Sequence, residues 1–220
     1  MSTKQTIAVI GASGNMGSAI SKSLSKGNYR LILCSDEAGK VESVVNEIKN
    51  SNPSADVEAL GCSAEASWEA DIIIVAVPYA AEREVAERIK DFANQKIVIS
   101  ISNPLNQTFN GLVTAPDTSA AEELQKLLPN SKVVKAFNTT FAADFAAPVI
   151  DGKQVDAFIA GNNEEALQIV SELVSTAGFN PIVAGDLSVS RTLEGMQLLL
   201  IQLGMKYNYN WLAGWKILHN

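Results

Sequence analysis

Short, continuously apolar runs alternate with segments of helical spacing along most of this chain. The clearest run extends from Asp71 to Val77 and stops at Pro78. Strands that are apolar throughout are typical of a parallel sheet whose two faces are both covered by helices. Because crossovers between parallel strands are almost always right-handed, the alternation favours a doubly wound arrangement. We therefore predict an α/β fold of the Rossmann type, with a doubly wound, mostly parallel sheet and a C-terminal helical extension.

Strands and helices can be assigned over nearly the whole chain. Strands are expected at 6–10, 30–35, 57–60, 71–77, 96–101, 132–137, 155–160 and 181–184. Helices are expected at 15–26, 41–50, 80–92, 119–128, 164–177 and 187–205. The last helix carries four consecutive apolar residues, 198–201, which would leave it no solvent face at that level. A second subunit could cover this helix, and packing within the monomer against Trp211 and Trp215 is the alternative.

Composition excludes several kinds of partner and site. The net charge of −7 argues against a nucleic-acid partner and against binding to an anionic membrane. No signal-peptide stretch precedes the first strand, and the longest apolar run, 72–81, is well short of the roughly 20 residues that span a bilayer. A cytoplasmic protein is expected. The single histidine, His219, is next to last, so no Ser-His-Asp, Cys-His or multi-histidine zinc site can form. Two unrelated cysteines, Cys34 and Cys62, predict neither a disulfide framework nor a metal site.

A glycine-rich turn follows the first predicted strand and opens the first helix. The dinucleotide fingerprint requires a tight turn, a glycine where the backbone meets pyrophosphate, and a glycine where helix packs on strand. Gly14 and Gly17 fill the second and third roles. The first glycine of the standard spacing would fall at Ala12, and Gly11 stands just before it. An acidic residue also follows the second strand, so we predict that this turn binds a nucleotide.

The start of the first helix explains how this turn would bind pyrophosphate. The N–H groups around Asn15 and Met16 have no partner within the helix, and the helix dipole places about half a positive charge there. Pyrophosphate would satisfy both. The cofactor-binding residues predicted here are Gly11, Ser13, Gly14, Asn15 and Met16.

Three residues after the second strand bear on the choice between NAD and NADP. The carboxylate of Asp36 could accept hydrogen bonds from the ribose hydroxyls of NAD, and it would repel a 2′-phosphate. Against this, Ser35 and Lys40 could gather with Ser13 around such a phosphate. Alternatively, Lys40 is a solvated helix residue and Ser35 only ends the strand. Both cofactors therefore stay open at this point.

Other candidate residues follow strands at the same carboxyl edge, where ligands bind in such sheets. Val77 and Pro78 end one strand, and Asn103-Pro104 ends the next. Asn103 could hydrogen-bond the ribose or the nicotinamide amide, although Asn-Pro also simply starts turns. Asn138 and Thr139 follow a further strand and could face the nicotinamide or a second substrate.

The whole chain resembles the family of deazaflavin-dependent NADP oxidoreductases, the reductases of coenzyme F420. The resemblance is carried by the segments 7–17, 77–78, 133–139 and 184–187, followed by Ser190, Arg191 and Glu194. The chain is also similar to the cytosolic domain of six-transmembrane ferric reductases, which share the Lys-x-Phe-Asn pattern of residues 135–138 and a similar ending.

The resemblance implies that hydride passes between NADPH and a flavin or deazaflavin stacked at the carboxyl edge of the sheet. It places the nucleotide on the segments 13–16 and 138–142, including Ala142, and on Ser35 and Lys40. It also implies a homodimer built through the C-terminal helix. In the family an arginine usually follows the serine, and here that residue is Asp36.

The sequence therefore predicts an oxidoreductase that moves a hydride between NAD(P)H and a flavin, deazaflavin or related small-molecule acceptor. Such transfer depends on proximity and orientation, so no catalytic side chain is named. Residues 1–186 are expected to form the NAD(P)-binding Rossmann-like domain, and 187–220 a helical segment for dimerisation and for one wall of the substrate site. A redox-sensing module without turnover is the alternative. A small hydroxyacid or imine reductase is less favoured, because those enzymes carry a longer helical second domain.

Overall fold

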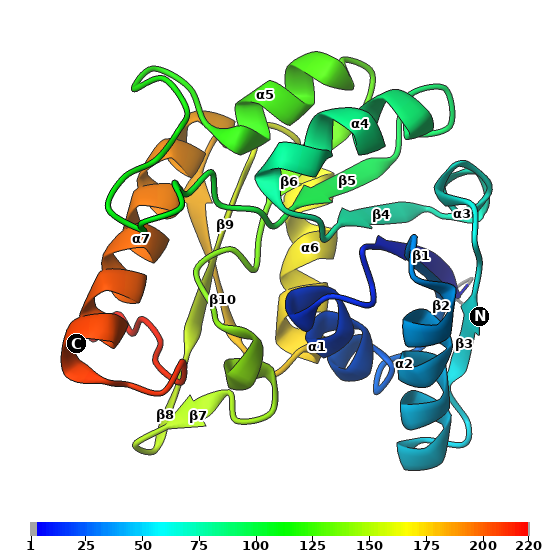
Figure 1. Cartoon of the computed structure of the whole chain (residues 1–220), viewed down its shortest axis with the longest axis horizontal. Helices are drawn as coiled ribbons and strands as arrows, with labels where there is room; N and C mark the ends of the chain where they lie inside the picture. Colours follow the sequence, from blue (N-terminus) through cyan, green and yellow to red (C-terminus); the bar gives the residue numbers. More distant parts are fainter. Residues whose placement is uncertain (1–3, 220) are drawn as a thin grey trace.

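The computed structural model describes residues 4–219 and contains one eight-stranded sheet with helices on both faces (Figure 1). The strands are β1 Gln5–Ile10, β2 Tyr29–Cys34, β3 Asp56–Ala59, β4 Ile72–Val75, β5 Ile97–Ser100, β6 Lys132–Lys135, β9 Asp156–Gly161 and β10 Asn180–Gly185. The helices are α1 Asn15–Leu24, α2 Ala38–Ser51, α3 Ser63–Glu69, α4 Tyr79–Ile89, α5 Ala120–Leu127, α6 Glu164–Thr176 and α7 Ser190–Tyr207. Short 3-10 turns, η1 Ala142–Phe145 and η2 Leu187–Val189, and a hairpin of β7 Val149–Ile150 and β8 Lys153–Gln154 complete the chain.

The order of strands in the sheet is β10-β9-β6-β5-β4-β1-β2-β3. The strands from β3 to β6 are parallel to one another, and β9 pairs antiparallel with β6. The strand order reverses beside β1, which lies between β2 and β4, and a crevice for ligands opens at such a point. The predicted fold class is confirmed.

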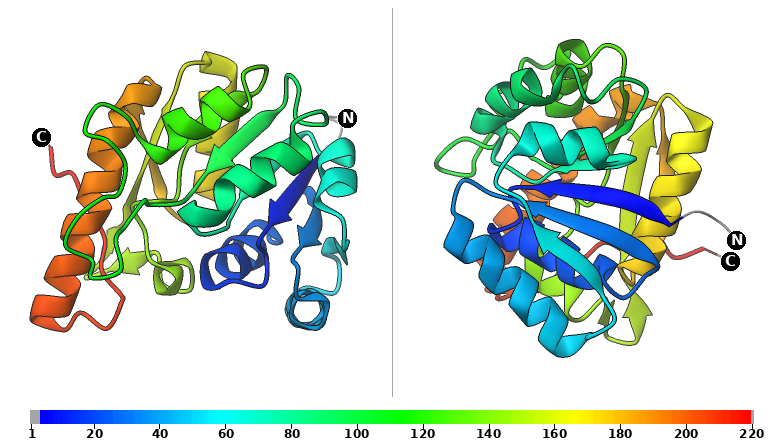
Figure 2. Two further views of the ribbon diagram at one scale, coloured as in Figure 1. Left: turned by 45° about the horizontal axis from the view of Figure 1, so that its top comes forward. Right: turned by 90° about the vertical axis from the view of Figure 1, so that its right-hand side faces the viewer.

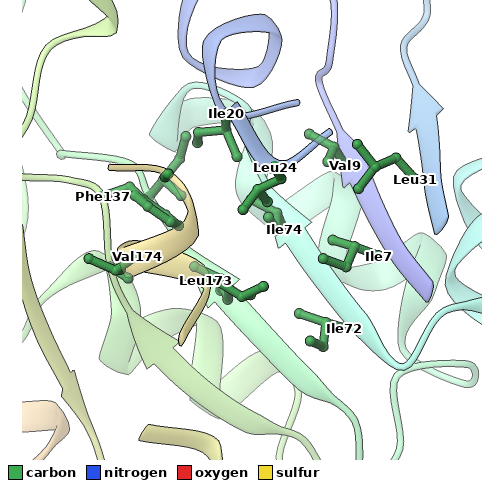
Figure 3. Close-up of a cluster of buried hydrophobic side chains, with 14 of the residues drawn as sticks. Ile7, Val9, Ile20, Leu24, Leu31, Ile72, Ile74, Phe137, Leu173 and Val174 are labelled. Carbon is green, nitrogen blue, oxygen red and sulfur yellow. The ribbon is translucent and has the colours of Figure 1, made fainter. Parts of the chain in front are cut away.

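Strand β4 shows why a continuous apolar run predicted a covered sheet. All four of its residues are fully buried, and they alternate between two cores. Ile72 and Ile74 belong to the core shared with α1, α2 and α6 (Figure 3). Ile73 and Val75 belong to the core shared with α4 and α5, on the opposite face (Figure 2). At about 25 cal/mol per Å² of apolar surface removed from water, such two-sided burial is the main stabilising contribution.

The structure differs from the predicted helices in two places. The segment 63–69 forms helix α3, which the sequence analysis left unassigned. The predicted helix at 187–205 starts as the 3-10 turn η2, because the Asp186 carboxylate accepts the Ser188 N–H and caps that turn. Helix α7 proper begins at Ser190. Within residues 4–219, no helix combines the length and apolar character needed to cross a membrane.

The four apolar residues 198–201 of α7 divide between buried and exposed positions. Leu200 and Ile201 are buried against Phe141 and Trp215. Leu199 is 46% exposed. Packing within the monomer therefore covers one side of the helix, and the opposite side is open in the single chain.

Candidate functional site

The glycine turn between β1 and α1 is held in place by close backbone contacts. The N–H groups of Gly11 and Ala12 both donate to the Cys34 carbonyl, at 2.8 and 3.0 Å, which ties the turn to the end of β2. Gly11 has a φ of +89°, and a Cβ there would overlap the Ala76 carbonyl oxygen. A Cβ at Gly17 would overlap the carbonyl oxygen of Gly11. Only glycine fits at either position, so α1 can approach β1 closely.

Gly14 has a different environment and marks the start of α1. It is the N-cap residue, and among the described residues no side chain caps this helix end and none in its first turn is acidic. A Cβ at Gly14 would lie 3.4 Å from the Gly11 oxygen, an ordinary contact distance. The N–H groups of Asn15 and Met16 are therefore free of any side-chain cap. Such a helix start suits a pyrophosphate.

Beside the turn lies a cavity of about 540 Å³ that is large enough for an adenosine. Ser35 and Asp36 from the end of β2 line one side, and Val77 and Pro78 from the end of β4 line another. The Ser13 and Ser35 hydroxyl oxygens are 2.5 Å apart, so the first turn and the second strand meet there. With Gly11, which also lines it, the structure therefore brings together five of the predicted cofactor residues around one hollow.

Asp36 and Lys40 point to different surroundings. The Asp36 side chain is 91% exposed, and its nearest charged partner is the Arg88 guanidinium at 3.6 Å. Lys40 pairs with Glu37 at 2.5 Å and lines the neighbouring groove together with Ser13. Arg88 lines the same hollow as Asp36 but comes from α4, and nothing in the local sequence pointed to it.

Along the carboxyl edge, two further cavities adjoin the glycine turn. One, of about 810 Å³, is mainly apolar and is lined by residues such as Met16, Val77, Pro78 and Asn103. The other, of about 290 Å³, lies toward α7. Asn15, Met16 and Asn103 line both, so the two cavities meet at the start of α1. Ligand atoms in either cavity would lie next to a pyrophosphate on that helix.

The smaller cavity is walled by residues from segments far apart in the chain. It is lined by Asn138, Thr140, Phe141, Ala142, Gln197 and Trp211, among others. The Asn103 side chain donates to the Asn138 carbonyl at 3.0 Å, and the Asn138 side chain donates back to Asn103 at 2.9 Å. Asn103 thus fixes the orientation of the Asn138 amide.

Two buried oxygens in this cavity wall lack hydrogen bonds. Among the described residues, Asn138 Oδ1 and Gln197 Oε1 have no partner, although the two residues are only 1% and 3% exposed. A buried polar group without a partner costs about 1–3 kcal/mol. Both atoms are acceptors with under 1 Å² of exposed surface, so a ligand with N–H groups would satisfy them once their side chains turn toward the cavity. The sequence analysis missed Gln197, which lies in the middle of α7 and carries no local signal.

Thr139 does not lie where the sequence analysis expected. It is fully buried, and the Phe158 N–H points to its hydroxyl at 3.4 Å. The reason is the backbone of Phe137, whose φ of +61° turns the chain at the end of β6. Asn138 then faces the cleft, and Thr139 faces the core. Such a left-handed conformation at a bulky residue costs of order 1–3 kcal/mol and is typical of functional sites.

A buried charged cluster beneath the cavities positions α7. Lys135, fully buried, lies 2.7 Å from the equally buried Glu194 and donates to the Ser102 carbonyl at 2.5 Å. Burial raises the pKa of neighbouring Glu82 to about 7, against the lowering effect of Lys135. Glu194 is three residues before Gln197 on the same helix. The ion pair therefore sets the depth at which Gln197 reaches the cavity.

Comparison with known proteins identifies the family. The model of the family "NADP oxidoreductase, coenzyme F420-dependent" matches residues 6–104. The F420-dependent NADP reductase of Methanocaldococcus jannaschii is 32% identical over 212 residues, which is 91% of this chain and 93% of that protein. The chain belongs to this family. The predictions of the family and of an NAD(P)H-dependent oxidoreductase are thus confirmed.

Other relatives share less of their length or only the fold. The metalloreductase STEAP3 of Rattus norvegicus is 34% identical over 62% of this chain, which is 27% of that protein. A solved protein from Arthrobacter sp. FB24, assigned to the F420-dependent NADP reductases, superimposes with a TM-score of 0.84 at 22% identity over 98% of this chain and all of that one. A reductive aminase of Aspergillus terreus solved with NADPH gives a TM-score of 0.69 at 15% identity, covering 94% of this chain and 64% of its own.

Proposed function

We propose that this protein transfers a hydride between NADPH and coenzyme F420. The observation that carries the proposal is the match over nearly the full length of an F420-dependent NADP reductase. The structure is compatible with it, because a helix start suited to pyrophosphate opens onto two cavities at the carboxyl edge of the sheet.

The nucleotide would lie across the strand ends beside β1. Its pyrophosphate would bind at residues 13–16, including Gly14, and its adenosine in the hollow of Ser35, Asp36 and Pro78. Ser13 and Ser35 would donate hydrogen bonds from their hydroxyls to a 2′-phosphate, and Lys40 lies on the adjoining groove. The nicotinamide would then reach the apolar cavity near Met16, Val77 and Asn103.

The acceptor would occupy the smaller cavity next to it. The unpartnered oxygens of Asn138 and Gln197 would accept hydrogen bonds from its ring N–H groups, and Ala142 would contact it through the backbone turn of η1. When bound, the dihydronicotinamide supplies the hydride. The protein holds the two rings adjacent and excludes water, which accounts for a site without a catalytic acid or base.

The C-terminal segment 187–220 would form the outer wall of the acceptor site and a homodimer contact. Large apolar side chains remain exposed on α7 and just beyond it: Leu199, Met205, Tyr207, Tyr209 and Leu212. Exposed apolar groups gathered in this way are typical of protein contacts. Sedimentation of the protein at micromolar concentration would test the dimer.

The direct test is NADPH oxidation with coenzyme F420 as the acceptor, with FMN as a comparison. We expect rapid oxidation that depends on F420. The alternative of a redox sensor predicts nucleotide binding in calorimetry with no turnover by any acceptor, and that result would overturn the proposal.

A further inference from the structure

The last residues of the chain fold back beside the smaller cavity. Helix α7 ends at Tyr207, and the tail then reverses direction and returns to the start of β9 (Figure 1). The reversal uses left-handed backbone conformations at Asn208, Asn210 and Trp211, with φ values of 56°, 52° and 58°. For a bulky tryptophan this conformation is rare and persists only where the surroundings impose it.

A buried carboxylate anchors the tail. Asp156, fully buried at the start of β9, accepts the Ile217 N–H at 2.6 Å and the Lys216 ammonium at 2.7 Å. Its own N–H donates to the Trp215 carbonyl at 2.9 Å. Burial alone would raise the pKa of Asp156, but the hydrogen bonds from Ile217, Lys216 and Asn180 outweigh burial and lower it. The anchor is therefore ionised and fully engaged at neutral pH.

Close packing at Gly214 makes this anchor rigid. A Cβ at Gly214 would overlap both methyl groups of Val155, so the tail backbone lies directly against that side chain. The tail is thus fixed by α7 before Trp211 and by the contacts with Val155 and Asp156 after it. The position of Trp211 is set from both ends.

Trp211 itself lines the cavity yet remains 53% exposed. Its ring stands edge-to-face with Phe141, with centroids 5.5 Å apart and an angle of 88° between planes. The same cavity wall carries the unpartnered oxygens of Asn138 and Gln197. A large, half-exposed aromatic surface in a wall that also contains two amide side chains suits a planar heteroaromatic ring.

We propose that the anchored tail presents Trp211 as a stacking wall for the planar ring of the acceptor, and that this wall selects the acceptor. The inference rests on the proposed function and adds a specificity-determining residue to it. The substrate class it favours is an extended, flat heterocycle rather than a small carbonyl compound.

The test compares Trp211→Ala and Trp211→Phe with the wild type, using NADPH and coenzyme F420. Loss of the ring should raise the KM for F420 about tenfold or more, because stacking on an aromatic side chain contributes that much to binding. Trp211→Phe should keep most of the affinity for F420, and the Kd for NADPH should stay unchanged in both variants. Trp68→Ala is the matched control, since Trp68 is 69% exposed on α3 and does not line this cavity.

Asp156→Asn gives a second test that leaves the tryptophan in place. Weakening the anchor should raise the KM for F420, as Trp211→Ala does, with a smaller effect on kcat. Quenching of tryptophan fluorescence by F420 supplies a readout without turnover, and Trp211→Phe should remove most of it while Trp68→Phe should not.

The outcomes separate the two proposals. A wild-type protein that oxidises no NADPH with F420 would refute the proposed function. The role of Trp211 would be refuted, and the proposed function kept, by three results together. These are turnover by the wild type, an unchanged KM in Trp211→Ala, and undiminished quenching in Trp211→Phe. Thermal unfolding of each variant shows whether the protein is folded under the conditions in which KM is measured. If Trp211→Ala does not fold, Trp211→Phe still tests the role of the ring.

Discussion

The nucleotide turn and the acceptor cavity are built on different physical principles. The turn at 11–17 consists of backbone: Gly11 and Gly17 without room for a Cβ, N–H groups tied to Cys34, and an uncapped helix start. The acceptor cavity consists of side chains that converge from the end of β6, from α7 and from the tail. Backbone sites depend on a short local pattern, whereas convergent side chains depend on the whole fold.

The two regions also differ in which polar groups lack partners: at the turn these are the backbone N–H groups that open α1. The Ser13 and Ser35 hydroxyls pair with each other beside the turn. In the acceptor cavity, Asn138 and Gln197 leave buried oxygens without partners, and Phe137 carries a strained backbone. Unsatisfied and strained groups destabilise the apoprotein, and a bound ligand can offset that cost. We therefore expect a nucleotide to meet a backbone turn that is already in place, and an acceptor to complete the cavity beside it.

The largest expected effect comes from Gly17→Ala, which would disrupt the backbone packing of the turn. The added methyl overlaps the Gly11 carbonyl and pushes α1 away from β1. We expect the free energy of unfolding to fall by about 3 kcal/mol, and NADPH binding to disappear. Urea unfolding and calorimetry would measure both. Gly39→Ala is the control because no atom lies within 4 Å of the added Cβ; equal losses in the two variants would contradict the packing argument.

Glu82→Gln should change how stability depends on pH. The native pKa of about 7 lies above the ordinary value of 4.5, so between these values the folded state binds more protons than the unfolded state. Stability therefore falls as pH rises through this window. The glutamine variant should lose that dependence and be more stable than the wild type by about 3 kcal/mol at pH 8, at roughly 1.4 kcal/mol per pKa unit. Parallel stability curves for the two proteins would show that Glu82 is not the group responsible.

Asp36→Arg should change the affinity of the proposed nucleotide site for NADPH. The carboxylate is exposed beside the adenosine hollow, where it would repel a 2′-phosphate. Replacing it by arginine should strengthen NADPH binding by about 1.5–3 kcal/mol through a charge-assisted hydrogen bond, with little gain for NADH. Asp91→Arg makes the same change of charge at the end of α4, outside the cavity lining. An unchanged NADPH affinity in Asp36→Arg would place Asp36 away from the ribose.

Gln197→Leu has the smallest expected effect. It should improve the stability of the apoprotein but weaken binding of the acceptor. Removing a buried oxygen without a partner should stabilise the apoprotein by about 1 kcal/mol. The same change should raise the KM for the acceptor, because a hydrogen-bond acceptor is lost from the cavity wall. Gln202→Leu serves as the control, since Gln202 is exposed and bonds the Phe109 carbonyl. A Gln197→Leu protein that is both less stable and fully active would contradict the proposed completion by ligand.

How much the sequence could predict follows the same division. The apolar run 72–75 predicted the covered sheet, and the glycines predicted the tight turn before α1, because both depend on neighbours in sequence. The positions of Gln197 and Trp211 depend on the Lys135–Glu194 pair and on the Asp156 anchor. Those contacts join segments far apart in the chain.

Two further differences have local causes that residue types do not reveal. Thr139 was predicted to face the substrate, but the left-handed turn at Phe137 directs it into the core. Arg88 reaches the hollow lined by Ser35 and Asp36 from α4 through the length of its side chain. Backbone reversals at bulky residues and the reach of long side chains both require the fold to be known.

We propose that one cleft holds NADPH and the deazaflavin ring next to each other for direct hydride transfer. Reaction of F420 with NADPH deuterated at the transferred C4 position, followed by mass spectrometry of the reduced acceptor, tests this claim most directly. We expect one deuterium in the reduced F420, and none when unlabelled NADPH reacts in deuterated water, once exchangeable positions have been washed out. Reduced F420 without the label, or nucleotide binding without any reduction, would contradict it.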